Sequence, residues 1–150
     1  MKIYLVQHGE AESKDVNPNR PLTQRGREQT QLMAEMAAKL ELGIQEIRHS
    51  GKTRTEETAV IFGRSLSLMG NVLAVSGLGP VDDVRPGAEE LTRGSKPVML
   101  VGHLPFMARL AALLVNDDPE KSPVEFRNSG IVCLAPENGS WQVQWQLIPG

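Results

Sequence analysis

The chain has 150 residues, of which 40% are hydrophobic and 23% charged, and its formal net charge at pH 7 is -2. A chain of this length buries roughly two thirds of the surface that its unfolded form exposes, so we expect a single domain, 1–150, that needs no cross-links. Because basic residues are not in large excess, the composition argues against a general nucleic-acid-binding protein but allows a local pocket for an anion.

The number of cysteines and the lengths of the apolar segments indicate the cellular compartment of the protein. Cys133 is the only cysteine, so the chain can form neither an internal disulfide nor a zinc-binding cysteine cluster. The first apolar run is too short for a secretory signal, and no run approaches the ~20 residues of a membrane helix. We therefore expect a cytoplasmic monomer without a nucleic-acid or membrane partner.

The first half of the chain predicts two strand and helix pairs. Residues 3–6 form a short β-rich run before Gly9, which predicts a buried strand. Thr23 can cap a helix whose apolar positions fall at helical spacing: Leu32, Met33, Met36, Ala37 and Leu40. Residues 46–49 form a weaker strand pattern between two helical ones. The next helix begins at about Thr53, and one face has Thr55, Thr58, Ala59, Phe62 and Leu66.

In the second half, residues 72–75 and 98–101 are continuous apolar runs, typical of strands covered on both faces. A short helix is expected around 88–93, and a longer one follows Pro105, with an apolar stripe of Met107, Leu110, Ala111 and Leu114.

A strand at 131–134 and a strictly alternating segment at 141–147 end the chain. The alternation predicts a half-exposed edge strand with Trp141 and Trp145 on one face, joined to its neighbour by a turn at Asn138. Strands that alternate with helices predict a three-layer α/β/α domain whose sheet is mostly parallel, with an antiparallel pairing near its end.

Polar side chains follow three of these strands. Ligands of an open α/β sheet bind beyond the carboxyl ends of its strands. His8 follows the first strand, Ser50 and then Arg54 follow the second, and His103 follows the run at 98–101. We therefore expect His8, Arg54 and His103 to share one site.

Such a cluster suits phosphoryl transfer. A neutral imidazole, here that of His8, can attack phosphorus and form a phosphohistidine that water then hydrolyses. Arg54 offers a planar fork that matches phosphate oxygens, and a protonated His103 can donate to another oxygen. Helix amino termini near Thr53 and Pro105 would add positive dipole ends.

The motifs resemble those of the histidine phosphatase superfamily. They occur in order as His8-Gly9-Glu10, Arg20-Pro-Leu-Thr23 followed by Gly26, Ser50-x-x-x-Arg54-x-x-x-Thr58-Ala59, and Val101-Gly-His-x-Pro105. Within that superfamily, the short length is similar to the SixA-type phosphohistidine phosphatases. The resemblance implies a six-stranded mixed sheet, a phosphorylated His8, phosphate contacts from Arg54 and His103, no metal or cofactor, and a phosphorelay-type phosphoprotein as substrate.

Two positions depart from the family pattern. Gln7 stands where the family has arginine, and Gly51 stands where it usually has proline. A hydrogen bond to a charged group is worth about 1.5 to 3 kcal/mol, so the first change weakens one phosphate contact and slows turnover about tenfold to a few hundredfold. Four other cationic residues are candidates to restore the charge: Arg20, Arg48, Lys52 and Arg127. We expect Gln7, Gly9 and Glu10 to contact the substrate.

The general acid has several candidates. Glu10 follows the histidine motif directly, and Asp82 and Asp83 follow the strand at 72–75. Each is equally well explained as a solvated or helix-capping carboxylate, and a phosphohistidine substrate needs little help because imidazole is a good leaving group.

Three functions remain open from the sequence. The first is a metal-independent phosphatase that acts on protein phosphohistidine. The second is a phosphate-binding or phosphoprotein-binding module that lost useful turnover through Gln7. The third is a phosphatase of small phosphate esters, although the chain has little insertion to build a specificity lid.

Overall fold

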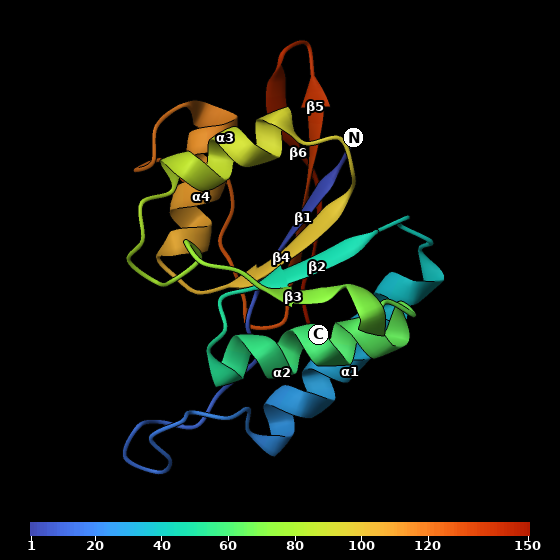
Figure 1. Ribbon diagram of the computed structural model, residues 1–150, viewed down its shortest axis with the longest axis vertical. Helices are drawn as coiled ribbons and strands as arrows, with labels where there is room; N and C mark the ends of the chain where they lie inside the picture. Colours follow the sequence, from blue (N-terminus) through green and yellow to red (C-terminus); the bar gives the residue numbers. More distant parts are fainter.

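The computed structural model describes residues 1–150 and contains one six-stranded mixed sheet with helices on both faces (Figure 1). The strands are β1 (Ile3–Gln7), β2 (Glu46–His49), β3 (Val72–Ala74), β4 (Val98–Gly102), β5 (Ile131–Glu137) and β6 (Ser140–Leu147). Their order across the sheet is β3-β2-β4-β1-β5-β6, and β5 is antiparallel to both of its neighbours while the other pairings are parallel. The predicted α/β/α class, mostly parallel with one antiparallel pairing region near the end, is confirmed.

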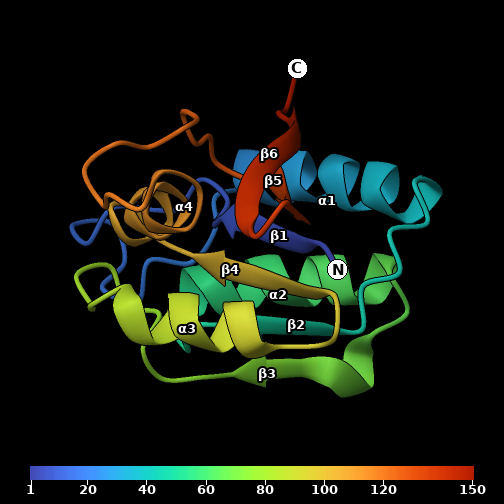
Figure 2. The same cartoon turned by 90° about the horizontal axis from the view of Figure 1, so that it is seen from above.

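Four α-helices form the outer layers of the fold (Figure 2). They are α1 (Gln24–Lys39), α2 (Thr53–Ser65), α3 (Arg85–Arg93) and α4 (Phe106–Asn116), and a short 3-10 helix η1 (Met69–Asn71) precedes β3. The helices α1 and α2 cover one face of the sheet, and α3 and α4 cover the other. None of them combines the length and the apolar character that a membrane crossing requires.

The central strands explain the two-sided core. In β1, Ile3 and Leu5 pack into the cluster under α3 and α4, whereas Tyr4 and Val6 pack into the cluster under α1 and α2. Side chains of successive strand residues point to opposite faces, so a strand buried on both sides must be apolar throughout. All five residues of β4 are buried, as its continuous apolar run predicts.

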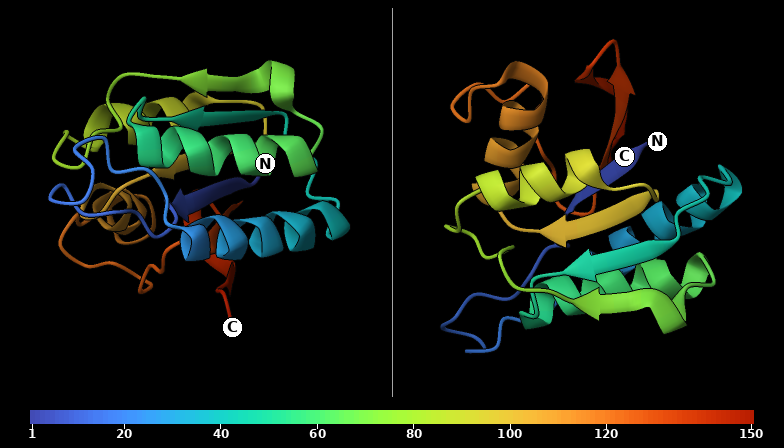
Figure 3. Two further views of the ribbon diagram at one scale, coloured as in Figure 1. Left: turned by 90° about the horizontal axis from the view of Figure 1, so that it is seen from below. Right: turned by 45° about the horizontal axis from the view of Figure 1, so that its top comes forward.

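The strand register aligns the carboxyl ends of β1, β2 and β4. Val101 of β4 lies opposite both Val6 of β1 and His49 of β2. The residues that follow these strands therefore emerge at one edge of the sheet, where the strand arrowheads end in Figure 3.

The buried face of α1 differs from the predicted stripe. Leu32, Met36 and Leu40 are 61%, 44% and 52% exposed. The buried positions are instead Gly26, Thr30, Met33, Ala34 and Ala37, a set at helical spacing but rotated from the expected one. Most of these side chains are small, which lets α1 lie close to the sheet and to α2. A stripe chosen by hydrophobicity alone was therefore wrong at three of its five positions.

The strand at 72–75 is not covered on both faces as predicted. As β3 it ends at Ala74 and forms an edge of the sheet, where Leu73 is 41% exposed. Because β3 pairs only with β2, its apolar run reflects contact with α2 on one side and not full burial.

The other edge strand, β6, is confirmed, but its tryptophans face opposite sides. The β5 and β6 register shifts so that Cys133 pairs with Trp145 and Leu134 with Val143. This shift leaves one extra residue in β6, and such a bulge reverses the side-chain direction beyond it. Trp141 therefore packs in the cluster under α3 and α4, whereas the Trp145 ring lies 6.0 Å from that of Tyr4 on the other side.

The start of α1 depends on a close backbone approach at Gly26. A Cβ atom at this position would overlap the carbonyl oxygen of Glu10. We expect Gly26→Ala to lower the free energy of unfolding by about 1–3 kcal/mol, which urea denaturation would measure. Gly70→Ala is the matched control, because nothing lies within 4 Å of its added Cβ. Equal stability of the two variants would contradict the close approach.

Candidate active site

A cleft of about 630 Å³ opens at the carboxyl edge of the sheet, and its lining includes His8, Arg54 and His103. His8 follows β1, Arg54 is the second residue of α2, and His103 follows β4. The three residues that the sequence predicts to share a site therefore do so. They are 46 and 49 positions apart along the chain, and the aligned strand ends bring them together.

His8 is held at its main chain and at its ring. Its N–H donates to the Gly102 carbonyl at 3.0 Å, and its carbonyl accepts from the Asn128 side-chain amide at 2.8 Å. Its ring Nδ1 lies 2.7 Å from the Gly9 carbonyl oxygen, which can only accept. Nδ1 therefore holds the proton, and Nε2 keeps the free electron pair that a nucleophile needs.

The surroundings of His8 keep its ring neutral. Its pKa is lowered to about 4, chiefly by burial and in addition by the positive charges of Arg54 and Arg20, against the opposing hydrogen bond to Gly9. A cationic imidazolium has no electron pair to give, so this shift maintains the reactive form near neutral pH.

His103 is buried beside His8, and the two ring centroids are 5.3 Å apart in an edge-to-face arrangement. Its Nε2 lies 2.7 Å from the Ser50 hydroxyl. Burial, followed by the charge of Arg54, lowers the pKa of His103 to about 3. Without an anion the ring is neutral, so the protonated His103 expected from the sequence requires the negative charge of a bound phosphoryl group.

Four cationic side chains line the cleft: Lys14, Arg20, Lys52 and Arg54. The ion pairs of the protein all involve other basic residues, so none of these four has a carboxylate partner. The Nε of Arg54 is buried without a hydrogen-bond partner, and burial followed by the charge of Arg20 lowers the pKa of Arg54. Clustered cations without a counter-ion are unfavourable, so the cleft is prepared for an anion.

Arg20 and Lys52, two of the candidates to replace the charge missing at Gln7, thus lie in the cleft. The Arg20 Nε donates to the Glu12 carbonyl at 3.0 Å, which holds its guanidinium in place. Arg48 and Arg127 do not lie there, because each pairs with glutamates elsewhere.

The amino terminus of α2 adds partial positive charge. Thr53, its first residue, lines the cleft, and the capping residue Lys52 makes no side-chain hydrogen bond to the helix. The first N–H groups of a helix without such a cap are open to an anion. Gly51 has φ +89°, which proline cannot adopt, so a proline at this position would not fit the turn as it stands here.

Gln7, Gly9 and Glu10 lie next to the cleft but do not line it. The Gly9 N–H donates to the Thr58 hydroxyl at 2.9 Å, and a Gly9 Cβ would lie only 2.7 Å from the Thr30 hydroxyl oxygen. The Glu10 carboxylate accepts from the Thr23 hydroxyl, which caps α1. The Gln7 side-chain oxygen is buried without a hydrogen-bond partner.

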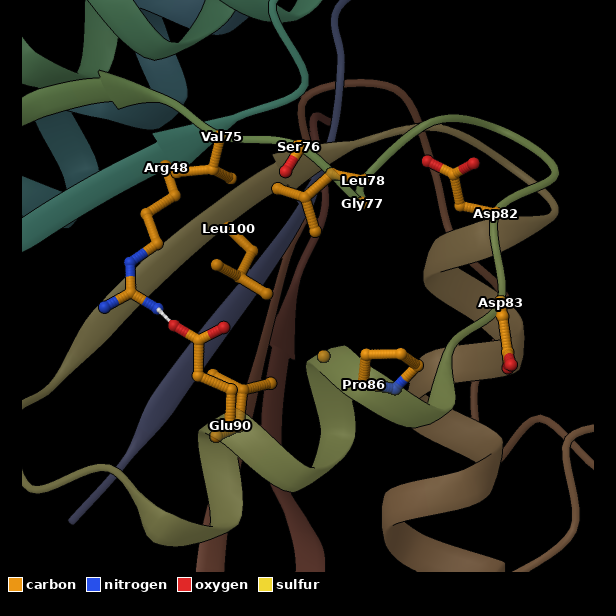
Figure 4. A pocket seen from close by; sticks show the side chains of 12 residues that line it. Arg48, Val75, Ser76, Gly77, Leu78, Asp82, Asp83, Pro86, Glu90 and Leu100 are labelled. Atoms are coloured by element: carbon orange, nitrogen blue, oxygen red, sulfur yellow. Dashed lines mark hydrogen bonds and ion pairs between the residues drawn. The ribbon is translucent and has the colours of Figure 1, made fainter.

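The other candidate acids, Asp82 and Asp83, border a different pocket of about 300 Å³ beside α3, together with Arg48 (Figure 4). Asp82 accepts from the Gly79 N–H and Asp83 from the Arg85 N–H, so both cap turns. No carboxylate lines the His8 cleft.

His49 lies at the end of β2 and has a structural place. It is buried, and its Nδ1 accepts from the Gly51 N–H at 3.1 Å. Burial lowers the pKa of His49, so it supports the turn as a neutral ring.

Sequence reasoning missed Asn128, which fixes the His8 carbonyl, and Lys14 on the cleft wall. One signal existed for Asn128. It precedes β5, and an antiparallel strand begins at the edge where the parallel strands end. For Lys14, which lies in a long loop, no periodicity or spacing gave a position.

The family model described as "Histidine phosphatase superfamily (branch 1)" matches residues 3–75, which include His8 and Arg54. Over these residues the chain resembles the members of this superfamily. It is 28% identical over 155 aligned residues to phosphohistidine phosphatase SixA of Escherichia coli (strain K12), covering 99% of this chain and 94% of that protein. This similarity supports a hydrolase of the phosphatase class.

Solved structures agree with this assignment. The structure of the protein histidine phosphatase SixA complexed with tungstate superposes with a TM-score of 0.87 at 28% identity, covering 99% of this chain and 97% of that one. A structure of the putative phosphohistidine phosphatase SixA from Agrobacterium tumefaciens gives 0.79 at 22% identity, with coverage of 99% and 97%, and shows the shared fold. The expected fold family is confirmed.

The two neutral histidines predict how stability depends on pH. Their folded-state pKa values, about 4 and about 3, lie below the usual 6.5, so the unfolded chain binds more protons between these values. The free energy of unfolding should therefore fall as the pH drops from 6.5 toward 4 and show no such loss above 6.5.

Urea unfolding at a series of pH values, with NMR titration of the rings, measures this dependence. A variant with both His8→Gln and His103→Gln should lose less stability on acidification than the original chain. Ring titration midpoints near 6.5 in the folded protein would contradict the shifts.

Proposed function

We propose that this phosphatase removes the phosphoryl group from phosphohistidine on a protein, through a phosphohistidine intermediate at His8. One observation supports it most directly: His8 presents a neutral ring with a free Nε2 in a cleft that also holds Arg20 and Arg54, neither of which has a carboxylate partner. The similarity to the SixA phosphatases, whose name specifies phosphohistidine, supports the substrate class.

In the first step, the Nε2 electron pair of His8 attacks phosphorus. The P–N bond to the substrate imidazole breaks as the new P–N bond to His8 forms. The leaving imidazole, already protonated at its other ring nitrogen, takes the electron pair of the broken bond and departs as a neutral ring. Charge on the three equatorial phosphoryl oxygens is met by Arg54, Arg20 and the open amino terminus of α2. A carboxylate acid is not required, because a protonated imidazole leaves readily.

In the second step, water attacks the phosphorus of phospho-His8. The P–N bond to His8 breaks, the electron pair returns to Nε2, and inorganic phosphate leaves with the oxygen and protons of the water. The Nδ1 hydrogen bond to Gly9 keeps the ring in the same orientation for the next cycle.

A protein substrate fits the surroundings of the cleft. Val81 is 88% exposed and Leu104 is 41% exposed, and both line the opening beside Lys14 and Lys52. Exposed apolar side chains next to lysines suit an acidic protein surface around the phosphorylated residue. A small phosphate ester would leave these groups without contacts.

The alternative of a phosphate-binding module with little turnover has one observation in its favour. The Gln7 side-chain oxygen has no hydrogen-bond partner, and an amide gives no charge to a phosphoryl group. In the phosphatase that we propose, the Arg20 guanidinium supplies that charge. The phosphatase and the binding module therefore differ in whether Arg20 supports catalysis.

Phosphate release from a phosphohistidine-bearing protein and from an aryl phosphate tests the proposed function. We expect His8→Ala to reduce release to background, Arg20→Gln to reduce kcat/KM about tenfold or more, and Gln7→Arg to raise it about tenfold. In the Gln7→Arg background the loss caused by Arg20→Gln should be smaller, since one charge then replaces the other.

Other results of this experiment would support one of the alternative functions or contradict the intermediate. Phosphate binding without His8-dependent release from either substrate would establish the binding module. Release from the aryl phosphate alone would indicate a phosphatase of small esters. Release that persists in His8→Ala would overturn the intermediate at His8.

The protein-docking part of the proposal has its own test. Val81→Ser should raise KM for the phosphoprotein about fivefold to tenfold, because an apolar contact is lost, and leave kcat/KM for the aryl phosphate unchanged. Leu32→Ser, on the exposed side of α1 at 61% exposure, is the matched control and should change neither. An unchanged phosphoprotein KM in Val81→Ser would contradict docking at this edge.

A further inference from the structure

A chain of three hydrogen bonds extends from His103 into the protein. His103 Nε2 lies 2.7 Å from the Ser50 hydroxyl, and that hydroxyl lies 2.7 Å from the Thr55 hydroxyl. The Thr55 hydroxyl donates to the Lys52 carbonyl at 2.9 Å. Thr55 has no exposed surface and His103 is 1% exposed, so water does not compete strongly for these bonds.

The direction of every bond in this chain follows from the last one. A carbonyl oxygen can only accept, so the Thr55 hydroxyl donates its single proton to the Lys52 carbonyl. It must therefore accept from the Ser50 hydroxyl. Ser50 then has no proton left and must accept from His103. His103 is therefore protonated at Nε2, and its Nδ1 has a free electron pair. This buried atom has no hydrogen-bond partner.

We propose that Ser50 and Thr55 are positioning residues that fix His103 in the Nε2–H tautomer and so reserve Nδ1 as the atom that gains a proton when the phosphoryl group binds. The catalytic meaning rests on the proposed function. The tautomer itself does not, and it can be measured without turnover.

In this arrangement, His103 can donate a hydrogen bond to the phosphoryl group only under one condition. With Nε2 committed to Ser50, the ring can donate to a phosphoryl oxygen only through Nδ1, and only once Nδ1 is protonated. The charged or titratable groups that act on His103 are His8, Arg20, Lys52 and Arg54, all of which disfavour that proton in the empty cleft. The incoming phosphoryl charge reverses this balance, so His103 becomes a donor when substrate is present.

The substitution Thr55→Val interrupts this series of hydrogen bonds and changes little else in the structure. Valine has nearly the same shape, and the Lys52 carbonyl keeps its bonds from the backbone N–H groups of Thr55 and Glu56, at 3.1 and 2.9 Å. The Ser50 proton, released from Thr55, is then free to point at His103 Nε2, which favours the Nδ1–H tautomer.

Nitrogen-15 NMR of the imidazole rings reads the tautomer directly. In the original chain we expect His103 in the Nε2–H form, and in Thr55→Val a shift of at least about fivefold toward Nδ1–H, the weight of one net hydrogen bond. Thr55→Ser should restore the original form. Thr30→Val, which removes an equally buried hydroxyl that bonds Ser129 instead, should not change it. An Nδ1–H form in the original chain, or no shift in Thr55→Val, would overturn the proposal.

Calorimetric titration with inorganic phosphate, in buffers of different ionisation enthalpy, tests the proton at Nδ1. The original chain should take up more protons per bound phosphate than Thr55→Val, whose neutral His103 can already donate. Equal uptake would overturn the reserved role of Nδ1. Neither experiment depends on hydrolysis, so both results can be interpreted even if the protein does not have the proposed phosphatase activity.

Discussion

The site depends on the register that aligns β1, β2 and β4. Val6, His49 and Val101 lie side by side, so each strand ends at the same edge and delivers its next polar residue there. The same register joins the His8 N–H to the Gly102 carbonyl at 3.0 Å. A one-residue slip would exchange the side chains that pack in the two core clusters, so the packing that stabilises the fold also fixes the geometry of the candidate catalytic residues.

Within that geometry, electrostatics assigns the roles. The cleft holds cations without carboxylates, and burial keeps the neighbouring imidazoles neutral. Binding of an anion is therefore favourable at this site, and the neutral imidazole that the proposed attack on phosphorus needs is already present before substrate binds. The chain as a whole has a net charge of -2, so this positive region is local and contrasts with the remaining surface. That contrast favours an anionic substrate over other charged molecules.

Much of the fold and the three central residues could be predicted from the sequence, because buried strands have continuous apolar runs and polar residues follow them at fixed places. Four features could not. The buried face of α1 is set by small residues, which hydrophobicity does not mark, and the bulge in β6 has no local signal. The positions of Arg20 and of the loop before it depend on contacts with distant segments, such as the bond from the Leu22 N–H to the Glu57 carboxylate. Likewise, the hydroxyl chain behind His103 required the distances between side chains.

The central claim is that the phosphoryl group passes through His8. Rapid mixing of the protein with a radiolabelled phosphohistidine-bearing protein, followed by an alkaline quench and peptide mapping, would test it most directly. We predict a transient label that is stable to alkali, labile to acid and located on the peptide that contains His8. Phosphate release at full rate without any label on that peptide, at mixing times shorter than one turnover, would contradict the account.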